Sequence, residues 1–371
     1  MLAEDVRSAL DVPPADNTSM DGYAVRAADV PQAGTVLPVS QRVAAGVPPA
    51  PLAAGTAARI FTGAQIPPGA DAVVMQEQCV AQDGGAVRVD TVPEPGQWIR
   101  RRGEDVTCGS VVLPRGTRMT PQAMGLAASV GAATVRVARR PRVALLSTGD
   151  ELVMPGEPLR PGAIYNSNRF TLLGLLRALG CEATDLGIVP DRLDATREAL
   201  ARAARGHDLI VTSGGVSVGE EDHLRPAVQA QGRLDLWQIA IKPGKPLAFG
   251  QVNRPDGSAA HFIGLPGNPV SSFITFALAV RPVLLHLQGA AGWQPRALAL
   301  RADFDWPKPD RRQEFLRVRR NDAGGLDLFA NQSSGVLTSA VWGDGVVDNP
   351  PGQAIRRGDA VRYIAFSELL S

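Results

Sequence analysis

Residues 208–222 place a short apolar stretch directly before a loop rich in glycine and serine. The apolar stretch, Asp-Leu-Ile-Val-Thr, is typical of a buried strand in a parallel sheet. The loop that follows, Ser-Gly-Gly-Val-Ser-Val-Gly, combines backbone freedom with N–H and hydroxyl donors, and a helix is expected to begin at Asp222. Such a strand, loop and helix form either a phosphate-binding cradle or an ordinary strand-to-helix connection.

The alternation of strand and helix extends from residue 142 to residue 287. Strands are predicted at residues 143–147, 183–189, 209–212, 234–241, 247–250 and 262–265, and helices at 169–179, 194–204, 224–231 and 270–287. Strands that alternate with helices form βαβ units, which build a mostly parallel sheet with helices on both faces. We therefore predict a central α/β domain over residues 139–289.

Both flanks of this region lack that alternation. Residues 11–105 are rich in Pro and Gly between short β-branched runs, which predicts a β-rich domain. Residues 1–10 and 106–138, with a helix expected at 120–133, are predicted to form a connecting α/β subdomain. Short strands between turns at residues 293–371 predict a small β-barrel-like C-terminal domain. The predicted fold class is α/β multidomain, with a central mostly parallel α/β domain between two β domains.

Composition limits the class of function. The formal net charge is +1, so neither nucleic acid nor a membrane is an indicated partner. The 3 cysteines and 4 histidines are dispersed, which argues against a disulfide framework and against a zinc site. The N-terminus shows no signal-peptide pattern, and we expect a cytoplasmic protein.

Acidic side chains follow three of the predicted strands. In open α/β sheets ligands bind outside the carboxyl ends of the strands, where four polar loops are expected, at residues 147–152, 187–191, 213–222 and 264–269. Glu151, Asp191 and Asp222 lie in three of these loops, and carboxylate oxygens are the ligands that Mg²⁺ prefers. Each acid alone is more simply a helix cap or a solvated loop residue, but the combination beside a Gly/Ser loop favours a magnesium and phosphate site.

Two lysines follow another predicted strand, in the sequence Lys-Pro-Gly-Lys-Pro at residues 242–246. Paired cations held by Pro and Gly suit a phosphate or a mineral oxyanion, although solvated surface lysines are a common alternative. Polar residues also gather at 16–24, 59–64 and 100–105 in the β-rich region. Their residue types alone leave open whether they cap turns or bind a ligand.

Together these segments resemble the molybdopterin molybdenumtransferase family, which includes the bacterial MoeA proteins and the gephyrin E domain. The matching segments occur in family order over nearly the whole chain, at residues 19–24, 61–63, 102–105, 147–151, 213–219, 242–246 and 264–269. The resemblance implies the last step of molybdenum cofactor synthesis. Family proteins bind adenylylated molybdopterin, hydrolyse its phosphoanhydride with Mg²⁺ and molybdate, insert molybdenum into the dithiolene and release AMP.

The resemblance also implies partners and roles for individual residues. The family's homodimer builds each site between the α/β domain of one subunit and the β-rich domain of the other, and molybdopterin adenylyltransferase and molybdoenzyme acceptors are further partners. Catalytic roles are implied for Asp21, Asp105, Glu151, Asp191 and Asp222. Of these, the family's Mg²⁺ ligands correspond to Glu151, Asp191 and Asp222. Substrate-binding roles are implied for Thr62, Arg100, Ser213, Gly214, Gly215, Ser217, Lys242, Lys245, Pro266, Gly267, Asn268, Arg317 and Ser334.

The sequence departs from the family pattern in places. Gln238 stands where some members carry a lysine. Members normally begin earlier, with a helical segment before the equivalent of residues 2–6, and several continue beyond the equivalent of residue 371.

Two alternatives to the transferase are open at this stage. One is molybdopterin adenylyltransferase, the enzyme of the preceding step, which shares the α/β fold and the Ser-Gly-Gly loop but needs only that domain. The other is a non-catalytic scaffold of the gephyrin type, against which the set of acidic residues weighs.

Overall fold

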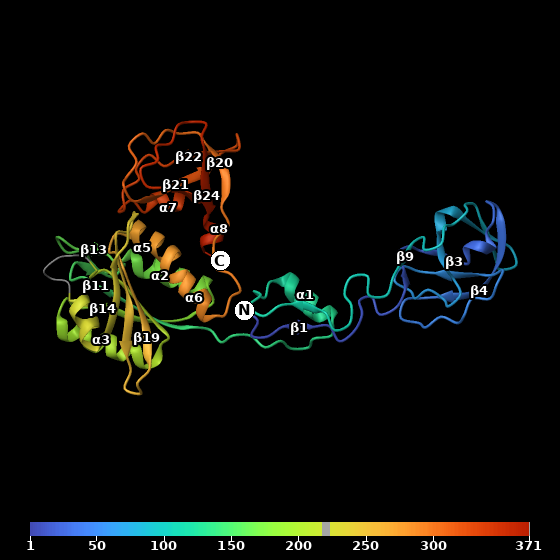
Figure 1. Ribbon diagram of the computed structural model, residues 1–371, viewed down its shortest axis with the longest axis horizontal. Coiled ribbons are helices and arrows are strands. Elements are labelled where there is room, and N and C mark those ends of the chain that lie inside the picture. The colour runs from blue at the N-terminus through green and yellow to red at the C-terminus, as the bar shows by residue number, and fades with distance from the viewer. Residues whose placement is uncertain (217–222, 371) are drawn as a thin grey trace. The chain divides into compact units, whose positions relative to one another are not determined.

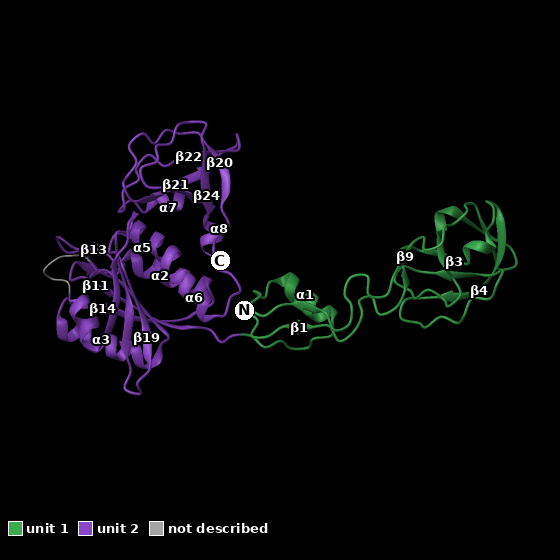
Figure 2. Cartoon of the chain, viewed as in Figure 1, with its two compact units in different colours: residues 1–137 green, residues 138–371 purple. Residues whose placement is uncertain are grey.

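The computed structural model describes residues 1–216 and 223–370. The chain divides into two compact units, Met1–Val137 and Ala138–Ser371 (Figure 2). Each unit has hydrophobic clusters of its own, which shows that each is held together by internal packing.

The first unit contains a six-stranded β-sheet in the order β6-β3-β5-β4-β8-β7. Its strands are β3 (Gly22–Val25), β4 (Thr35–Val43), β5 (Ala57–Ile60), β6 (Ala72–Met75), β7 (Cys79–Gln82) and β8 (Ala86–Val89). Val25, Leu37, Val74 and Val87 are buried together on this sheet. Two short strands form a separate antiparallel pair. They are β2 (Asn17–Thr18), which precedes the sheet in the sequence, and β9 (Ile99–Arg100), which follows it. The predicted strand runs of the β-rich region are therefore present.

The remainder of the first unit is a small body built from both ends of its sequence. The strands β1 (Val6–Arg7) and β10 (Val111–Leu113) pair antiparallel, and α1 (Pro121–Ser129) packs beside them. Thr120 caps this helix by accepting a hydrogen bond from the Ala123 N–H at 3.3 Å, and Pro121 occupies its first turn. The helix ends before Gly131, whose positive φ of 85° suits glycine.

The second unit contains a six-stranded sheet in the order β14-β11-β15-β19-β18-β16. Its strands are β11 (Arg142–Thr148), β14 (Glu182–Val189), β15 (Leu209–Ser213), β16 (Gly232–Gln238), β18 (Pro246–Asn253) and β19 (Ala259–Leu265). The pairings β14-β11, β11-β15 and β15-β19 are parallel, as predicted. The pairings of β18 with β19 and with β16 are antiparallel, so the sheet is parallel only on one side.

Helices cover both faces of this sheet (Figure 1). They are α2 (Ser167–Ala178), α3 (Leu193–Gly206), α4 (Leu224–Gln231), α5 (Pro269–Thr275) and α6 (Arg281–Leu287). Val143 and Leu145 of β11 pack in a cluster with α2, α5 and α6, whereas Ala144 and Leu146 pack in a cluster with α3 and α4. This alternation along one strand is the period of two that a strand buried on both faces requires.

Residues Pro269–Leu287 form a nearly continuous apolar helix in the core of the second unit. A π-helical turn, η3 (Phe276–Val280), joins α5 to α6, and Pro282, which has no N–H, follows it in the first turn of α6. By length and composition this helix could cross a membrane, but 67% of an 18-residue stretch of it is buried inside the protein. It is therefore explained as a core helix of the α/β domain.

The C-terminal region forms a closed β-barrel in the second unit. Its strands are β20 (Leu298–Ala302), β21 (Gln313–Arg320), β22 (Gly325–Leu328), β23 (Gly345–Asn349) and β24 (Ala360–Ala365), in the order β21-β22-β20-β24-β23. The barrel closes because β23 pairs with β21, and a short strand from the α/β domain, β17 (Ile241–Lys242), is added to β21. Two short helices, α7 (Thr338–Trp342) and α8 (Phe366–Leu369), complete it, and the Phe366 ring packs edge-on against Phe273 of α5.

Candidate functional site

A cleft of about 620 Å³ opens where β11, β14, β15 and β19 end. Its walls come from all four polar loops that were predicted to follow these strands. The cleft brings together the predicted site residues Glu151, Asp191, Ser213, Gly214, Gly215, Pro266, Gly267 and Asn268. The position agrees with the general rule that ligands of open α/β sheets bind at the carboxyl ends of the strands. The predicted residues Ser217 and Asp222 lie outside the described residues.

The loop after β15 packs tightly against the loop after β11. Gly214 and Gly215 have φ of 90° and 64°, which side-chain-bearing residues rarely adopt. A Cβ on Gly214 would lie 2.5 Å from the carbonyl oxygen of Thr148, and one on Gly215 would lie 2.6 Å from the Thr148 hydroxyl. Both positions therefore require glycine, and their backbone forms part of the cleft wall.

Two acidic loops meet at one end of the cleft. The Asp150 N–H donates to Asp191 Oδ2 at 3.3 Å, and the Asp191 N–H donates to Asp150 Oδ1 at 3.2 Å. Burial raises the pKa of Asp191, and the nearby charges of Asp150 and Glu151 raise it further. The site therefore concentrates negative charge, which a bound cation would offset. Asp150 contributes to this negative charge, although the sequence analysis did not single it out.

The acids fit Mg²⁺ as far as the described residues extend. Glu151 and Asp191 both line the cleft and supply carboxylate oxygens. Residues 1–216 and 223–370 contain no group of three or more His, Cys, Asp or Glu side chains arranged to hold a metal ion. Two carboxylates suit Mg²⁺, because this ion usually binds one or two protein carboxylates and keeps water and substrate phosphate as its other ligands.

Asn168 is a site residue that the sequence analysis missed. Its side chain is buried, and its Nδ2 donates to Ser213 Oγ at 2.8 Å and to the Gly267 carbonyl oxygen at 2.7 Å. It lies in the first turn of α2, where Asn166 caps the helix by accepting from the Arg169 N–H at 3.2 Å. Polar residues before a predicted helix indicate a cap, but they do not show that one of them reaches two other loops.

Within the described part of the chain, two buried polar atoms in the cleft wall have no hydrogen-bond partner. Thr148 Oγ1 and Asn166 Nδ2 lack a hydrogen-bond partner within residues 1–216 and 223–370, and their side chains belong to residues that are 5% and 2% exposed. Both residues line the cleft. Buried polar groups are normally hydrogen-bonded, so these two atoms indicate that the cleft receives a polar ligand or water.

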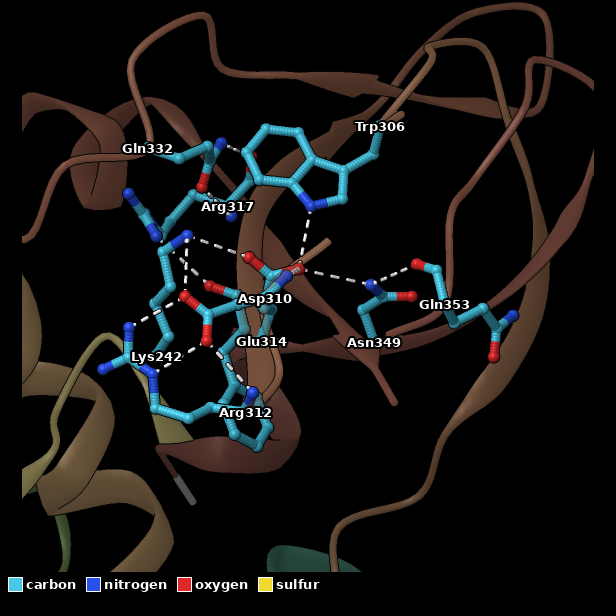
Figure 3. Close-up of polar contacts among 10 residues, drawn as sticks. Lys242, Trp306, Asp310, Arg312, Glu314, Arg317, Gln332, Asn349 and Gln353 are labelled. Atoms are coloured by element: carbon cyan, nitrogen blue, oxygen red, sulfur yellow. Dashed lines mark hydrogen bonds and ion pairs between the residues drawn. The ribbon is translucent and has the colours of Figure 1, made fainter. Parts of the chain in front are cut away.

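The two predicted lysines lie away from this cleft. Lys242 Nζ lies 3.1 Å from Glu314 Oε1 and 3.5 Å from Asp310 Oδ2 (Figure 3). Lys245 lines a second cavity, of about 680 Å³, together with Asp310 and Arg312. Pro246, the next residue, does line the main cleft. The loop at residues 242–246 therefore runs from the barrel to the cleft, and Asp310 lies near both of its lysines.

Arg317, a predicted substrate-binding residue, lies inside the barrel. Arg317 is 1% exposed, and its guanidinium donates to Ser339 Oγ at 3.1 Å and to the Ser333 carbonyl oxygen at 3.3 Å. Burial lowers its pKa to about 10. The side chain thus forms its hydrogen bonds with other residues inside the barrel. The neighbourhood of Ser334 does reach the cleft, because Gly335 lines it and the Ser334 carbonyl oxygen accepts from the Val270 N–H at 3.0 Å.

The remaining predicted residues lie in the first unit. Asp21 Oδ1 accepts hydrogen bonds from the backbone N–H and the hydroxyl of Thr62, both at 2.7 Å. These bonds lower the pKa of Asp21, the backbone bond contributing most. Arg100 is exposed at the end of β9, and Asp105 is exposed in the loop that follows, where its N–H donates to the Val12 carbonyl oxygen at 3.0 Å.

The fold and the cleft define a multidomain α/β protein with a polar cleft at the carboxyl ends of its parallel strands, where open α/β sheets bind their ligands. Three family models match the chain: the MoeA N-terminal region (domain I and II) at residues 1–131, the probable molybdopterin binding domain at 144–286 and the MoeA C-terminal region (domain IV) at 299–366. The chain therefore belongs to the MoeA family. This result confirms the predicted family and the predicted fold class.

Individual relatives agree with this assignment. A molybdopterin molybdenumtransferase of Haemophilus influenzae is 45% identical over 319 residues, which cover 85% of this chain and 78% of the relative. One from a Nostoc species is 36% identical over 364 residues, 95% of this chain and 83% of the relative. The crystal structure of the molybdopterin biosynthesis MoeA protein from Pyrococcus horikoshii has a TM-score of 0.82 and 30% identity, and the match covers 98% of this chain and 91% of that one.

Proposed function

We propose that this protein is a molybdopterin molybdenumtransferase. It inserts molybdate-derived molybdenum into the dithiolene of adenylylated molybdopterin, with Mg²⁺-dependent hydrolysis of the phosphoanhydride and release of AMP. The observation that carries the proposal is the convergence of Glu151, Asp191 and the Gly214–Gly215 backbone on one cleft in a chain of the MoeA family. Relatives that are 45% and 36% identical to this chain carry the name of this activity.

The described residues would divide the work between binding and charge compensation. Gly214 and Gly215 let the backbone approach the substrate phosphates closely, and Ser213 adds a hydroxyl donor. Glu151 and Asp191 would hold Mg²⁺, which neutralises negative charge that develops on the phosphoanhydride. Asn168 keeps the two loops that carry Ser213 and Gly267 at a constant separation, so the binding groups are positioned before substrate arrives.

We further propose that the active form is a cytoplasmic homodimer. Asp21, Thr62, Arg100 and Asp105 lie in the first unit, whereas Glu151 and Asp191 lie in the second. In the arrangement that we propose, the first set completes the site of the partner subunit. Molybdopterin adenylyltransferase would supply the adenylylated substrate, and molybdoenzymes would accept the product.

The proposed activity is tested with purified protein and adenylylated molybdopterin. We expect AMP release that requires Mg²⁺ and is accelerated by molybdate. Equal release in the presence of a chelator would contradict the role of Mg²⁺. Protein that binds adenylylated molybdopterin but never releases AMP would support the scaffold alternative.

The adenylyltransferase alternative is less well supported. That enzyme needs only the α/β domain, whereas the family match also covers residues 1–131 and 299–366 of this chain. Incubation with ATP and molybdopterin should therefore yield no adenylylated product, and accumulation of that product would favour the alternative.

A further inference from the structure

The loop at residues 242–246 begins in the sheet of the barrel and ends in the wall of the cleft. Ile241 and Lys242 of β17 pair in parallel with Gln313 and Glu314 of β21. The Gln313 N–H donates to the Ala240 carbonyl oxygen at 3.1 Å, and Pro246 at the other end of the loop lines the cleft. A shift of β21 would therefore move the loop relative to the cleft.

Glu314 is a fully buried carboxylate at this junction, with an exposed fraction of 0%. Its Oε1 accepts from Lys242 Nζ at 3.1 Å. Its Oε2 accepts from Trp306 Nε1 at 2.8 Å, from the Asp310 N–H at 3.1 Å and from Asn349 Nδ2 at 3.4 Å (Figure 3). Oε1 thus binds the lysine of the loop, whereas Oε2 accepts hydrogen bonds from residues of the barrel.

Asp310 provides a second, more exposed contact for the same lysine. Its Oδ2 lies 3.5 Å from Lys242 Nζ and 2.8 Å from Arg312 Nη2. The Lys242 ammonium also lies 5.9 Å from the centroid of the Trp306 ring. A buried carboxylate whose cation was removed would carry an uncompensated charge, so this pairing holds Lys242 far more firmly than an exposed ion pair would.

We propose that Glu314 is a positioning residue for the oxyanion-binding loop at residues 242–246. It acts from the barrel through Lys242 and thereby sets the position of the loop whose Pro246 forms the cleft wall. The inference rests on the proposed function and on the expectation from the sequence that Lys242 and Lys245 bind an oxyanion, here molybdate. It assigns to the C-terminal barrel a part in molybdate affinity in addition to its part in stability.

Glu314→Gln is the substitution that separates the two oxygens. Three donors converge on Oε2, so the amide oxygen of the glutamine will occupy that position. The amide NH₂ then faces Lys242, and because it is a hydrogen-bond donor it cannot accept from the ammonium. The variant therefore breaks the contact with the loop while it retains the contacts with Trp306 and Asp310.

Asn349→Ser is the matched control, because Asn349 contacts the same carboxylate through Oε2 and is not a partner of Lys242 in Figure 3. Thermal unfolding and steady-state AMP release at varied molybdate concentration are measured for both variants. We expect Glu314→Gln to raise the KM for molybdate by about tenfold, the loss expected for one charge-assisted contact, with a smaller change in kcat. Asn349→Ser should lower thermal stability and leave the KM for molybdate unchanged.

Two further results decide the inference. In the double variant Glu314→Gln/Lys242→Met, the effect of Glu314→Gln on the KM should disappear if it acts through the lysine. An unchanged KM in Glu314→Gln, or equal increases in Glu314→Gln and Asn349→Ser, would overturn the inference. If Glu314→Gln does not fold, Glu314→Asp replaces it, because the shorter side chain withdraws the carboxylate from Lys242. An unchanged KM for molybdate in that variant would likewise overturn the inference. Absence of molybdate-dependent AMP release in the unmodified protein would instead reject the proposed function.

Discussion

The side-chain amide of Asn168 donates to Ser213 Oγ at 2.8 Å and, through the same nitrogen, to the Gly267 carbonyl oxygen at 2.7 Å. Ser213 ends β15, and Gly267 follows β19, so one buried side chain from α2 links two loops of the cleft. No pattern in the sequence connects these three positions, which are far apart along the chain. The link shows that the cleft is pre-organised by residues outside the motifs that line it.

Asn168→Ala should damage both stability and activity. The substitution leaves Ser213 Oγ and the Gly267 carbonyl oxygen without this donor, and we expect the free energy of unfolding to fall by about 1–3 kcal/mol. AMP release should fall as well, because the two loops lose their common support. Denaturant unfolding and AMP release are measured beside Asn253→Ala, an exposed change at the end of β18. Equal results for the two variants would argue against the role of Asn168.

Gly214→Ala should prevent the loop after β15 from packing as it does. The new Cβ would lie 2.5 Å from the Thr148 carbonyl oxygen at a φ of 90°. We expect destabilisation by more than about 1 kcal/mol and loss of substrate affinity. Gly174→Ala in α2 is the control, since a Cβ there meets no atom within 4 Å and alanine favours helix. If Gly214→Ala binds substrate as tightly as the unmodified protein does, this loop is not a phosphate-binding cradle.

Asp191→Asn should have opposite effects on stability and activity. Burial and the charges of Asp150 and Glu151 raise the pKa of Asp191, so its charged form is disfavoured in the folded protein without Mg²⁺. Removing that charge should leave stability at neutral pH unchanged or increased when Mg²⁺ is absent. AMP release should fall by about a hundredfold or more. Thermal unfolding with chelator and AMP release across a Mg²⁺ titration measure the two effects, and near-normal turnover would remove Asp191 from the site.

Asp208 should cause the free energy of unfolding to decrease at acid pH. Its carboxylate binds the Arg139 guanidinium at 2.6 and 2.7 Å and accepts from the Arg142 N–H at 2.8 Å. The hydrogen bond from Arg139 is the main reason that its pKa falls to about 2. Because the unfolded value is about 3.9, this contribution is complete above that pH and is lost as pH falls towards 2.

The test compares denaturant unfolding between pH 2 and pH 7 for the unmodified protein and Asp208→Asn. The variant should be less stable at neutral pH, and its stability should change less as the pH falls from about 4 to 2. Asp322→Asn, in an exposed turn, should reproduce the pH profile of the unmodified protein. Parallel profiles for Asp208→Asn and the unmodified protein would contradict the assignment.

Mixed dimers test whether two subunits share a site. Asp21→Ala and Asp191→Asn chains should each be inactive alone, because each lacks one acid from a different unit. If each site combines the first unit of one subunit with the second unit of its partner, a mixed dimer contains one intact site and one doubly changed site. Activity should then return in part after subunit exchange. No recovery, with exchange demonstrated by mass, would place the whole site within one chain.

Local patterns determined the elements of this protein well. The helix predicted at 224–231 matches α4, and the apolar runs at 143–147, 209–212 and 262–265 lie in β11, β15 and β19. Periodicity, capping residues and glycine positions are properties of neighbouring residues, so the sequence contains them directly. The position of the cleft also followed, because parallel strands in a βαβ arrangement end at one edge of the sheet.

Contacts between distant segments were decided only by the tertiary structure. The antiparallel edge of the central sheet, the addition of β17 to the barrel and the burial of Arg317 depend on partners far along the chain. The same holds for Lys242, which looks like a free cation in sequence but is held by Glu314, 72 residues away. Residue type and spacing determine which groups can bind a ligand, whereas the packing of separate elements determines which of them face the ligand and which hold the protein together.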